Sequence, residues 1–284
     1  MVPETGPPPG RRRMDGMTDG VAAALGSGRQ AAFRIKVAVV WGALALLLLA
    51  FFQSFDLKFA LIAEKLPFLL GLRLTPGGFL QGAALTLLIC LLSIALSIVI
   101  GVLATAGRLS TNPVAYGVAT FYGSFFRGTP LMVQLLLLYL GLPQLGPVPA
   151  ALPCGVLALS LNYGAYLSEI FRAGVQSVAP GQREAAMALG LSRGQIAWTV
   201  ILPQATRFVI PPTGAQFVAM LKDSSLVSVT GLWEINFLAQ SYGRSSYRYV
   251  EMLLTAAVVY WMLSLIFEHV QSRLEVRYGR AYQR

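Results

Sequence analysis

The chain has 284 residues, of which 56% are hydrophobic and only 12% are charged, and its mean hydropathy is +0.64. This composition excludes an ordinary soluble domain and predicts an all-α integral membrane protein. The formal net charge is +10, but the basic residues are scattered between apolar segments rather than gathered in one patch with aromatic residues. That pattern argues against nucleic-acid binding and is typical of membrane proteins, whose cytoplasmic segments are basic.

The N-terminal residues 1–34 are polar, rich in Pro and Gly, and contain the run Arg11–Arg13. We expect them to form a disordered, basic cytoplasmic tail. The apolar run that follows starts too late and is too long for an ordinary cleavable signal peptide. Residues 35–54 are therefore predicted to be a first span that leaves the cell interior.

The remaining apolar segments predict five more spans, separated by short polar stretches. Residues 55–80 are expected outside, with an amphipathic helix at 59–72 lying in the membrane interface. An outer turn is expected at 142–152. The five spans are expected at about 81–106, 114–141, 152–173, 207–222 and 249–267. The first of these is the second span of the chain, and the span at 114–141 is interrupted by Arg127-Gly128-Thr129-Pro130.

Most of the 22 Lys and Arg residues fall on the side of this layout that holds both termini and residues 181–203. Because cytoplasmic segments carry the excess of Lys and Arg, this side is predicted to be cytoplasmic.

The polar interval 181–203 is too short and too polar to span a bilayer. Pro180 and Gly181 interrupt the preceding segment, and a run of helix formers begins at Glu184. Gly190 is placed to stop this helix, and Ser192 begins a second short helix that Pro203 is expected to end. We interpret the interval as a cytoplasmic knob for a partner protein, the alternative being an interfacial helix with no partner. Its candidate contact residues are Gly181, Glu184, Ala185, Ala186, Ala188, Leu189, Gly190 and Pro203.

Three charged residues, Arg127, Glu169 and Lys222, lie at membrane depth, where charges are costly and usually functional. Arg127 and Lys222 adjoin Gly/Pro-rich or Ser-rich breaks, and broken helices at depth can expose backbone groups to a polar ligand. The alternative is structural, with ion pairs such as Arg127–Glu169 or Lys222–Asp223 holding helices together.

Other conspicuous residues are expected to pack rather than to bind. Cys90 and Cys154 sit in apolar surroundings and are predicted to be small core residues. Tyr163, Tyr166 and Phe171 lie at helical spacings and are likewise expected mainly to pack.

The interval 181–203 resembles the EAA loop of the membrane subunits of bacterial ATP-binding-cassette importers. The match includes Glu184-Ala185-Ala186, Gly190 and Leu202-Pro203, whereas Val200 stands where that family usually has Ile. Residues 125–135, 161–192, 200–212 and 221–231 resemble the permeases of polar-amino-acid importers, which include histidine, glutamine, glutamate and arginine systems.

This resemblance covers about 80–275 and implies a type I importer permease core of five spans, to which the first span is an addition. It also implies a location in the bacterial inner membrane, in contact with lipid. The implied partners are two cytoplasmic ATPase subunits that grip the EAA loop, an external amino-acid-binding protein, and a second copy or paralogue of the permease. The implied ligand path involves Arg127, Asn162, Tyr166, Glu169 and Lys222.

No Gly-Lys-Ser or Gly-Lys-Thr occurs in the sequence, so no P-loop is present. We therefore expect that the chain is not an enzyme, that it binds no cofactor or metal, and that ATP and Mg²⁺ are bound by a separate subunit. Two other functions stay open: an ion-driven secondary transporter, and a membrane sensor or scaffold that moves nothing. Neighbouring genes for a P-loop ATPase and a secreted binding protein would favour the importer.

Overall fold

The computed structural model describes residues 31–50 and 57–279, with side chains described as far as residue 276, and the chain divides into two units after Leu57. Every regular element in these ranges is helical, which confirms the all-α prediction. In the first unit, the helix Ala31–Ala50 is apolar and long enough to cross a membrane. It contains residues 35–50 of the expected first span but begins at Ala31, so the expectation of a disordered tail is wrong for residues 31–34, which are helical because they continue the apolar helix toward its N-terminus. Residues 1–30 of the expected tail and residues 51–54 of the expected span lie outside the described ranges.

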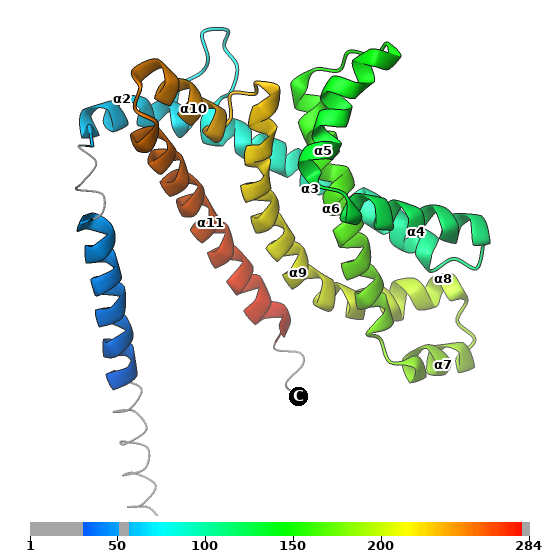
Figure 1. Cartoon of the computed structure of the whole chain (residues 1–284). Coiled ribbons are helices and arrows are strands. Elements are labelled where there is room, and N and C mark those ends of the chain that lie inside the picture. Colours follow the sequence, from blue (N-terminus) through cyan, green and yellow to red (C-terminus); the bar gives the residue numbers. More distant parts are fainter. Residues whose placement is uncertain (1–30, 51–56, 280–284) are drawn as a thin grey trace, which may run out of the picture. The chain divides into compact units, whose positions relative to one another are not determined.

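The second unit contains the predicted permease core (Figure 1). The α-helices of this unit are α2 (Phe59–Leu69), α3 (Gly82–Arg108), α4 (Pro113–Gly128), α5 (Leu131–Leu136), α6 (Ala151–Gln176), α7 (Pro180–Ala188), α8 (Arg193–Gln195), α9 (Leu202–Asp223), α10 (Ile235–Ser246) and α11 (Tyr249–Gly279). Shorter π- and 3-10 helices join some of them: η1 (Leu137–Gly141), η2 (Leu142–Leu145), η3 (Ile196–Ile201) and η4 (Ser224–Thr230).

The parallel helices α3 and α6 form the centre of this unit. Small residues recur every fourth position along the facing surfaces, from Ser93 to Thr105 on α3 and from Ser160 to Ser168 on α6, so they line one face of each helix. Three hydroxyl groups of α3 donate across the contact to main-chain carbonyls of α6 located 63 positions further along the chain: Ser93 Oγ to Val156 O at 3.4 Å, Ser97 Oγ to Ser160 O at 3.3 Å and Thr105 Oγ1 to Ser168 O at 3.0 Å. Gly101 lies between the last two contacts, against the carbonyl of Gly164. We call this set of contacts the α3–α6 ladder.

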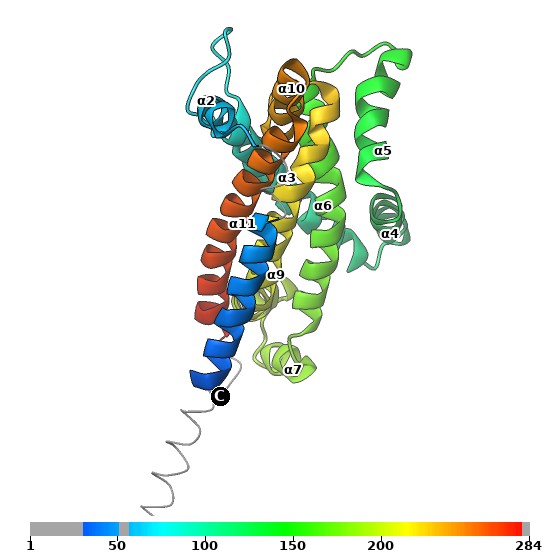
Figure 2. The ribbon, with the colours of Figure 1, turned by 60° about the vertical axis from the view of Figure 1, so that its left-hand side comes forward.

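The buried side chains of this unit include two hydrophobic clusters. The first joins α3, α5, α6, α9 and η4 and contains the free thiols Cys90 and Cys154, which confirms them as core residues. The second joins α2, α10 and α11. Figures 1 and 2 both show α2 and α10 at one end of this unit and α7 at the opposite end. The polar interval 181–203 therefore lies at the end remote from α2.

The helices follow the expected spans, with differences at their ends. Among the described residues, three helices are apolar and long enough to cross a membrane: Ala31–Ala50, α3 and α11. The segments Pro113–Gly128 and Leu131–Leu145 meet the same criterion only when they are taken together as one bent span. The helices α6 and α9 have 26 and 22 residues and are not among these candidate spans. The predicted total of six spans stays a prediction. The helix α11 continues beyond the expected end at 267, into the charged C-terminal segment.

Candidate functional site

A sharp break between α4 and α5 forms one wall of the candidate site. The helical chain bends by 105° between these two segments. Pro130 lacks a main-chain N–H and forces the preceding Thr129 out of the helical region, to φ −113° and ψ 145°. The interruption predicted at Arg127–Pro130 is thus present.

Two buried amides bond the carbonyl groups that this break leaves without helical partners. Gln134 Nε2 donates to the carbonyls of Phe126 and Thr129, at 2.9 and 3.1 Å. Asn162 Nδ2, from α6, donates to the carbonyl of Phe126 at 2.8 Å and to Gln134 Oε1 at 3.2 Å. Because unbonded carbonyl groups are costly when buried, these bonds stabilise the bend and attach it to α6.

The break, α6 and the end of α9 enclose a polar cavity of about 500 Å³, which we call the polar pocket. Three of the five predicted path residues line it: Arg127, Asn162 and Tyr166. Its other lining residues are Gly128, Thr129, Pro130, Leu131, Tyr163, Gln216, Ala219 and Asp223. The pocket therefore offers one guanidinium and one carboxylate together with uncharged hydrogen-bonding groups.

A tyrosine of α6 and the last residue of α9 meet in this pocket. The buried hydroxyl of Tyr163 donates to Oδ2 of Asp223 at 2.8 Å. The expectation that Tyr163 mainly packs was thus incomplete, because its ring is buried in the first core cluster while its hydroxyl fixes a carboxylate.

A group of four charged residues adjoins the polar pocket. Glu169 on α6 pairs with Arg127 of α4, with Arg108 of α3 and with Arg172 one turn further along α6. The Arg127–Glu169 pair, at 2.9 Å, is the ion pair considered as the structural alternative. Glu169 does not belong to the lining of the pocket, whereas Arg127 does.

Lys222 is not part of the polar pocket. It faces a separate cavity of about 320 Å³, which also has Ser225, Asn236 and Tyr260 in its lining. Within the described part of the chain, Lys222 and Asp223 form no ion pair. The structure therefore does not bring all five predicted path residues together.

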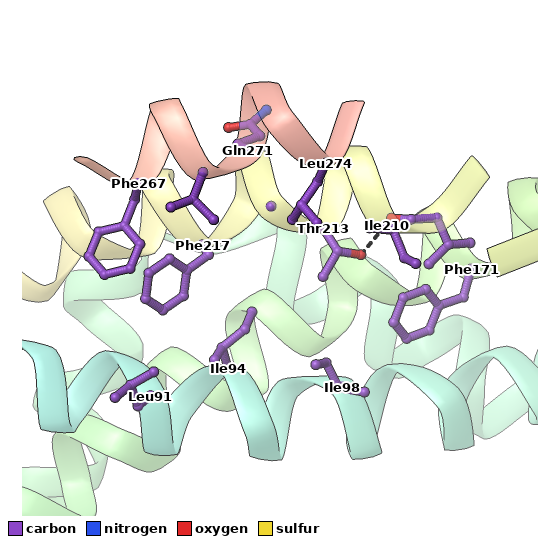
Figure 3. Close-up of a pocket in the computed structure, with 13 residues that line it drawn as sticks. Leu91, Ile94, Ile98, Phe171, Ile210, Thr213, Phe217, Phe267, Gln271 and Leu274 are labelled. Atoms are coloured by element: carbon purple, nitrogen blue, oxygen red, sulfur yellow. Dashed lines mark hydrogen bonds between the residues drawn. The ribbon is translucent and has the colours of Figure 1, made fainter. Parts of the chain in front are cut away.

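The cavity between α3, α9 and α11, about 470 Å³ in volume, has a different character (Figure 3). Its walls are almost entirely aliphatic and aromatic, including Phe217 and Phe267 in edge-to-face contact. The hydroxyl of Thr213 donates a hydrogen bond to the carbonyl of Val209 at 2.8 Å. Such a lining suits hydrocarbon and offers little to a charged ligand.

The short helix α7 forms the knob at the end of the unit remote from α2. The expected start at Glu184 is wrong, because α7 begins at Pro180, and a proline is accommodated in the first helical turn, where its missing N–H has no helical partner. Ala186 is buried, while its neighbours Ala185 and Ala188 are exposed and Leu189 is 81% exposed. Gly190 ends the segment with φ +78°, a backbone conformation that β-branched residues adopt poorly. Ala186 thus anchors α7 to the rest of the unit, while the side chains of Ala185, Ala188 and Leu189 stay exposed.

The second helix of the interval begins as predicted but does not end where predicted. Ser192 and Gln195 form reciprocal main-chain to side-chain bonds at its start, a capping box. The expected end at Pro203 is wrong, because the chain stays helical through η3 and α9. Pro203 lies in the first turn of α9, which follows the π-helical turn η3 without interruption, and Ile201, the last residue of η3, keeps helical dihedral angles.

Sequence reasoning missed several residues that line the polar pocket or brace the break beside it. Gln134 carried a signal, since it is a lone amide in an apolar run directly after a proline break. Asp223 lay beside the selected Lys222, and the choice between the two depends on how α9 ends. Gln216 carried no comparable signal.

The chain was compared with protein families and with individual proteins. Residues 97–280 match the family described as "Binding-protein-dependent transport system inner membrane component". The arginine transport system permease protein ArtQ of Bacillus subtilis is 36% identical over 221 residues, which is 78% of this chain and 96% of that protein. The glutamine transport system permease protein GlnP of Escherichia coli K12 is 37% identical over 204 residues, which is 70% of this chain and 91% of that protein.

A solved structure described as an amino acid ABC transporter with histidines is also similar. Its chain superposes with a TM-score of 0.71 at 35% identity, covering 78% of this chain and 99% of the other. The matched family region contains the α4–α5 break, the polar pocket and the α7 knob. The chain therefore belongs to the family of inner membrane components of binding-protein-dependent transport systems.

Proposed function

We propose that this chain is the membrane-spanning subunit of an ATP-driven importer for polar amino acids, and that the polar pocket is its ligand path. The observation that carries the proposal is the presence of Arg127 and Asp223 in one cavity between a broken helix, α6 and α9. The relatives that transport arginine and glutamine support the amino-acid class.

The pocket suits a zwitterion. A guanidinium is a good partner for an α-carboxylate, and the carboxylate of Asp223 is a good partner for an α-ammonium group. Asn162 and Gln216 offer amides, and Tyr166 a hydroxyl, to a polar side chain. Broken helices at membrane depth serve similar ligands in other transporters.

The exposed face of α7 is the proposed contact with a cytoplasmic ATPase subunit, which binds the ATP and Mg²⁺ that this chain does not bind. The small side chains Ala185 and Ala188 allow close approach to a groove, and Leu189 supplies an apolar contact. In the working complex a second permease copy or paralogue completes the membrane part, and an external binding protein delivers the amino acid at the opposite end.

This assignment requires the α7 end and both termini to be cytoplasmic, as the distribution of Lys and Arg predicts. Single cysteines at Ser110, which is partly buried, and at Gln182, which is exposed, test the orientation. They should react in intact cells only with a membrane-permeant reagent. Reaction of either cysteine with an impermeant reagent would reverse the topology.

The function is tested by reconstitution. The permease is co-expressed with the P-loop ATPase and the secreted binding protein encoded by neighbouring genes, and the complex is placed in proteoliposomes. Uptake of labelled L-glutamine, L-glutamate, L-histidine and L-arginine is measured with ATP and with a non-hydrolysable analogue. ATP-dependent uptake of at least one of them is expected. Uptake driven by an ion gradient without ATP, or no uptake of any of the four, would contradict the proposal.

A further inference from the structure

We propose that Glu169 is a positioning residue. While the polar pocket is empty, its carboxylate forms an ion pair with the guanidinium of Arg127. When the transported ligand enters, the carboxylate of the ligand replaces Glu169 as the partner of Arg127. This inference rests on the proposed function and specifies how the site receives its ligand.

The contacts give the two oxygens of Glu169 separate partners. Oε1 contacts NH2 of Arg127 at 2.9 Å and is also bonded by NH1 of Arg108. Oε2 accepts two bonds from Arg172, from Nε at 3.1 Å and from NH2 at 2.9 Å. Glu169 therefore keeps a bidentate partner and a second arginine if Arg127 turns away.

Arg127 is the member of this group that a ligand can reach. Its side chain is 36% exposed, against 17% for Arg108 and 31% for Arg172, and it lines the polar pocket while the other two arginines do not. Its Nε donates to the carbonyl of Gly123 at 3.0 Å, so the guanidinium stays beside the pocket when the partner of its NH2 group changes.

The balance of charge favours such an exchange. Within this group one carboxylate faces three guanidinium groups, and an excess positive charge inside a membrane is costly. A ligand carboxylate adds the missing negative charge at the one arginine that faces the pocket. When the ligand binds, Glu169 loses its contact with Arg127 but keeps those with Arg108 and Arg172. Every charged group therefore has a partner of opposite charge throughout the exchange.

Two substitutions in the group should then act in opposite directions. Glu169→Gln removes the competing carboxylate, so the KM for uptake should fall. Arg172→Ala removes the bidentate partner of Glu169, which strengthens its hold on Arg127, so the KM should rise. Changes of about threefold to fivefold are expected, the size that a partly exposed ion pair supports. A purely structural role for the group would instead impair both variants in the same direction.

The pairing itself is measured without transport. The permease in nanodiscs is treated with phenylglyoxal, which modifies accessible guanidinium groups, and modification of Arg127 is followed by peptide mass spectrometry. Glu169→Gln should accelerate the modification of Arg127 and Arg172→Ala should slow it. Glu268→Gln, which changes an exposed glutamate on α11, should leave the rate unchanged.

Uptake kinetics in proteoliposomes then test the exchange, with Arg127→Ala and the double variant Arg127→Ala/Glu169→Gln as references. The effect of Glu169→Gln should vanish when Arg127 is absent. A raised KM in Glu169→Gln, as for Arg127→Ala, would show that Glu169 itself binds the ligand and would overturn the inference. An unchanged labelling rate of Arg127 in Glu169→Gln would also overturn it. If the parent permease transports none of the four amino acids, the proposed function fails, while the labelling rates still decide whether Glu169 occupies Arg127.

Discussion

The hydroxyl of Tyr163 donates a hydrogen bond to Oδ2 of Asp223 at 2.8 Å and so links the middle of α6 to the end of α9 across the polar pocket. This bond fixes the position of the carboxylate in the pocket. A hydrogen bond to a charged group contributes about 1.5–3 kcal/mol.

We first predict the effect of removing this bond. Tyr163→Phe should reduce amino-acid uptake about tenfold, since Asp223 keeps its charge but loses its donor. Asp223→Asn should abolish uptake, because an amide does not neutralise an ammonium group. Tyr166→Phe, at an exposed tyrosine of the same pocket, serves as the matched control and should have a smaller effect. Equal uptake by Tyr163→Phe and the parent, at equal expression, would contradict a role for this bond.

The second prediction concerns the α3–α6 ladder. A Cβ atom at Gly164 would lie 2.8 Å from Ile100 Cγ2 and from the hydroxyl of Tyr122, so Gly164→Val should destabilise the protein by about 1–3 kcal/mol or more. Ser97→Ala removes one interhelical bond and should cost only about 0.6 kcal/mol. Thermal unfolding of the detergent-solubilised permease measures both. Similar losses in the two variants would indicate that close approach of the backbones is not what stabilises this contact.

The third prediction concerns coupling to ATP hydrolysis. Ala185→Trp adds bulk to the exposed face of α7, and Gly190→Val strains a residue at φ +78°. Both variants should insert normally, but they should retain less ATPase subunit on co-purification or hydrolyse ATP without uptake. Ala63→Trp, at an exposed alanine of α2 at the opposite end of the unit, is the control. Full retention of the ATPase subunit together with parental uptake in both α7 variants would refute the coupling role of this helix.

The fourth prediction concerns Glu234, which lies between α9 and α11, outside the spanning helices. Burial raises the pKa of this carboxyl from 4.5 to about 7, although the hydroxyl of Tyr260 and main-chain N–H groups act in the opposite direction. A pKa that is higher in the folded than in the unfolded state favours the folded state fully below about pH 4.5. That contribution is lost as the pH rises through about 7.

Thermal unfolding of the detergent-solubilised protein between pH 5 and 8 checks this effect. The melting temperature of the parent should fall across the range, whereas Glu234→Gln, which cannot ionise, should remove much of the fall. A parallel fall in both proteins would assign the pH dependence to other groups.

The sequence predicted well what depends on local chemistry. Apolar length located the helices, the Gly128–Pro130 run located the break, and the glycine at 190 located the end of α7. Each of these features is decided by a few neighbouring residues, through hydrophobic burial, a missing N–H or a positive φ.

Features that depend on packing between distant segments were predicted less well. The spacing along α6 indicates the pair of Glu169 with Arg172, and Arg127–Glu169 was considered as an ion pair, but Arg108 comes from α3 and no spacing in the chain indicates that all three arginines meet at one carboxylate. The choice between Lys222 and Asp223 depends on the helical phase at the end of α9, where the chain tightens into η4. Pro203 was expected to end a helix, but the π-helical turn η3 precedes it and the chain continues as helix through Pro203 into α9.

The constant separation of 63 residues along the α3–α6 ladder also limits how the length of this chain can vary. The turns between α3 and α4 and between η2 and α6 can gain or lose length without changing which side chains face each other across the ladder, whereas α4 and α5 are held by their contacts at the polar pocket. One residue inserted into α6 between Ser160 and Ser168 would instead turn the rest of that helix by about 100°. Thr105 would then face a different side of α6, and Gly101 would lose its glycine neighbour. Insertions and deletions should therefore be excluded from the interiors of α3 and α6, and between them tolerated only in the turns outside α4 and α5.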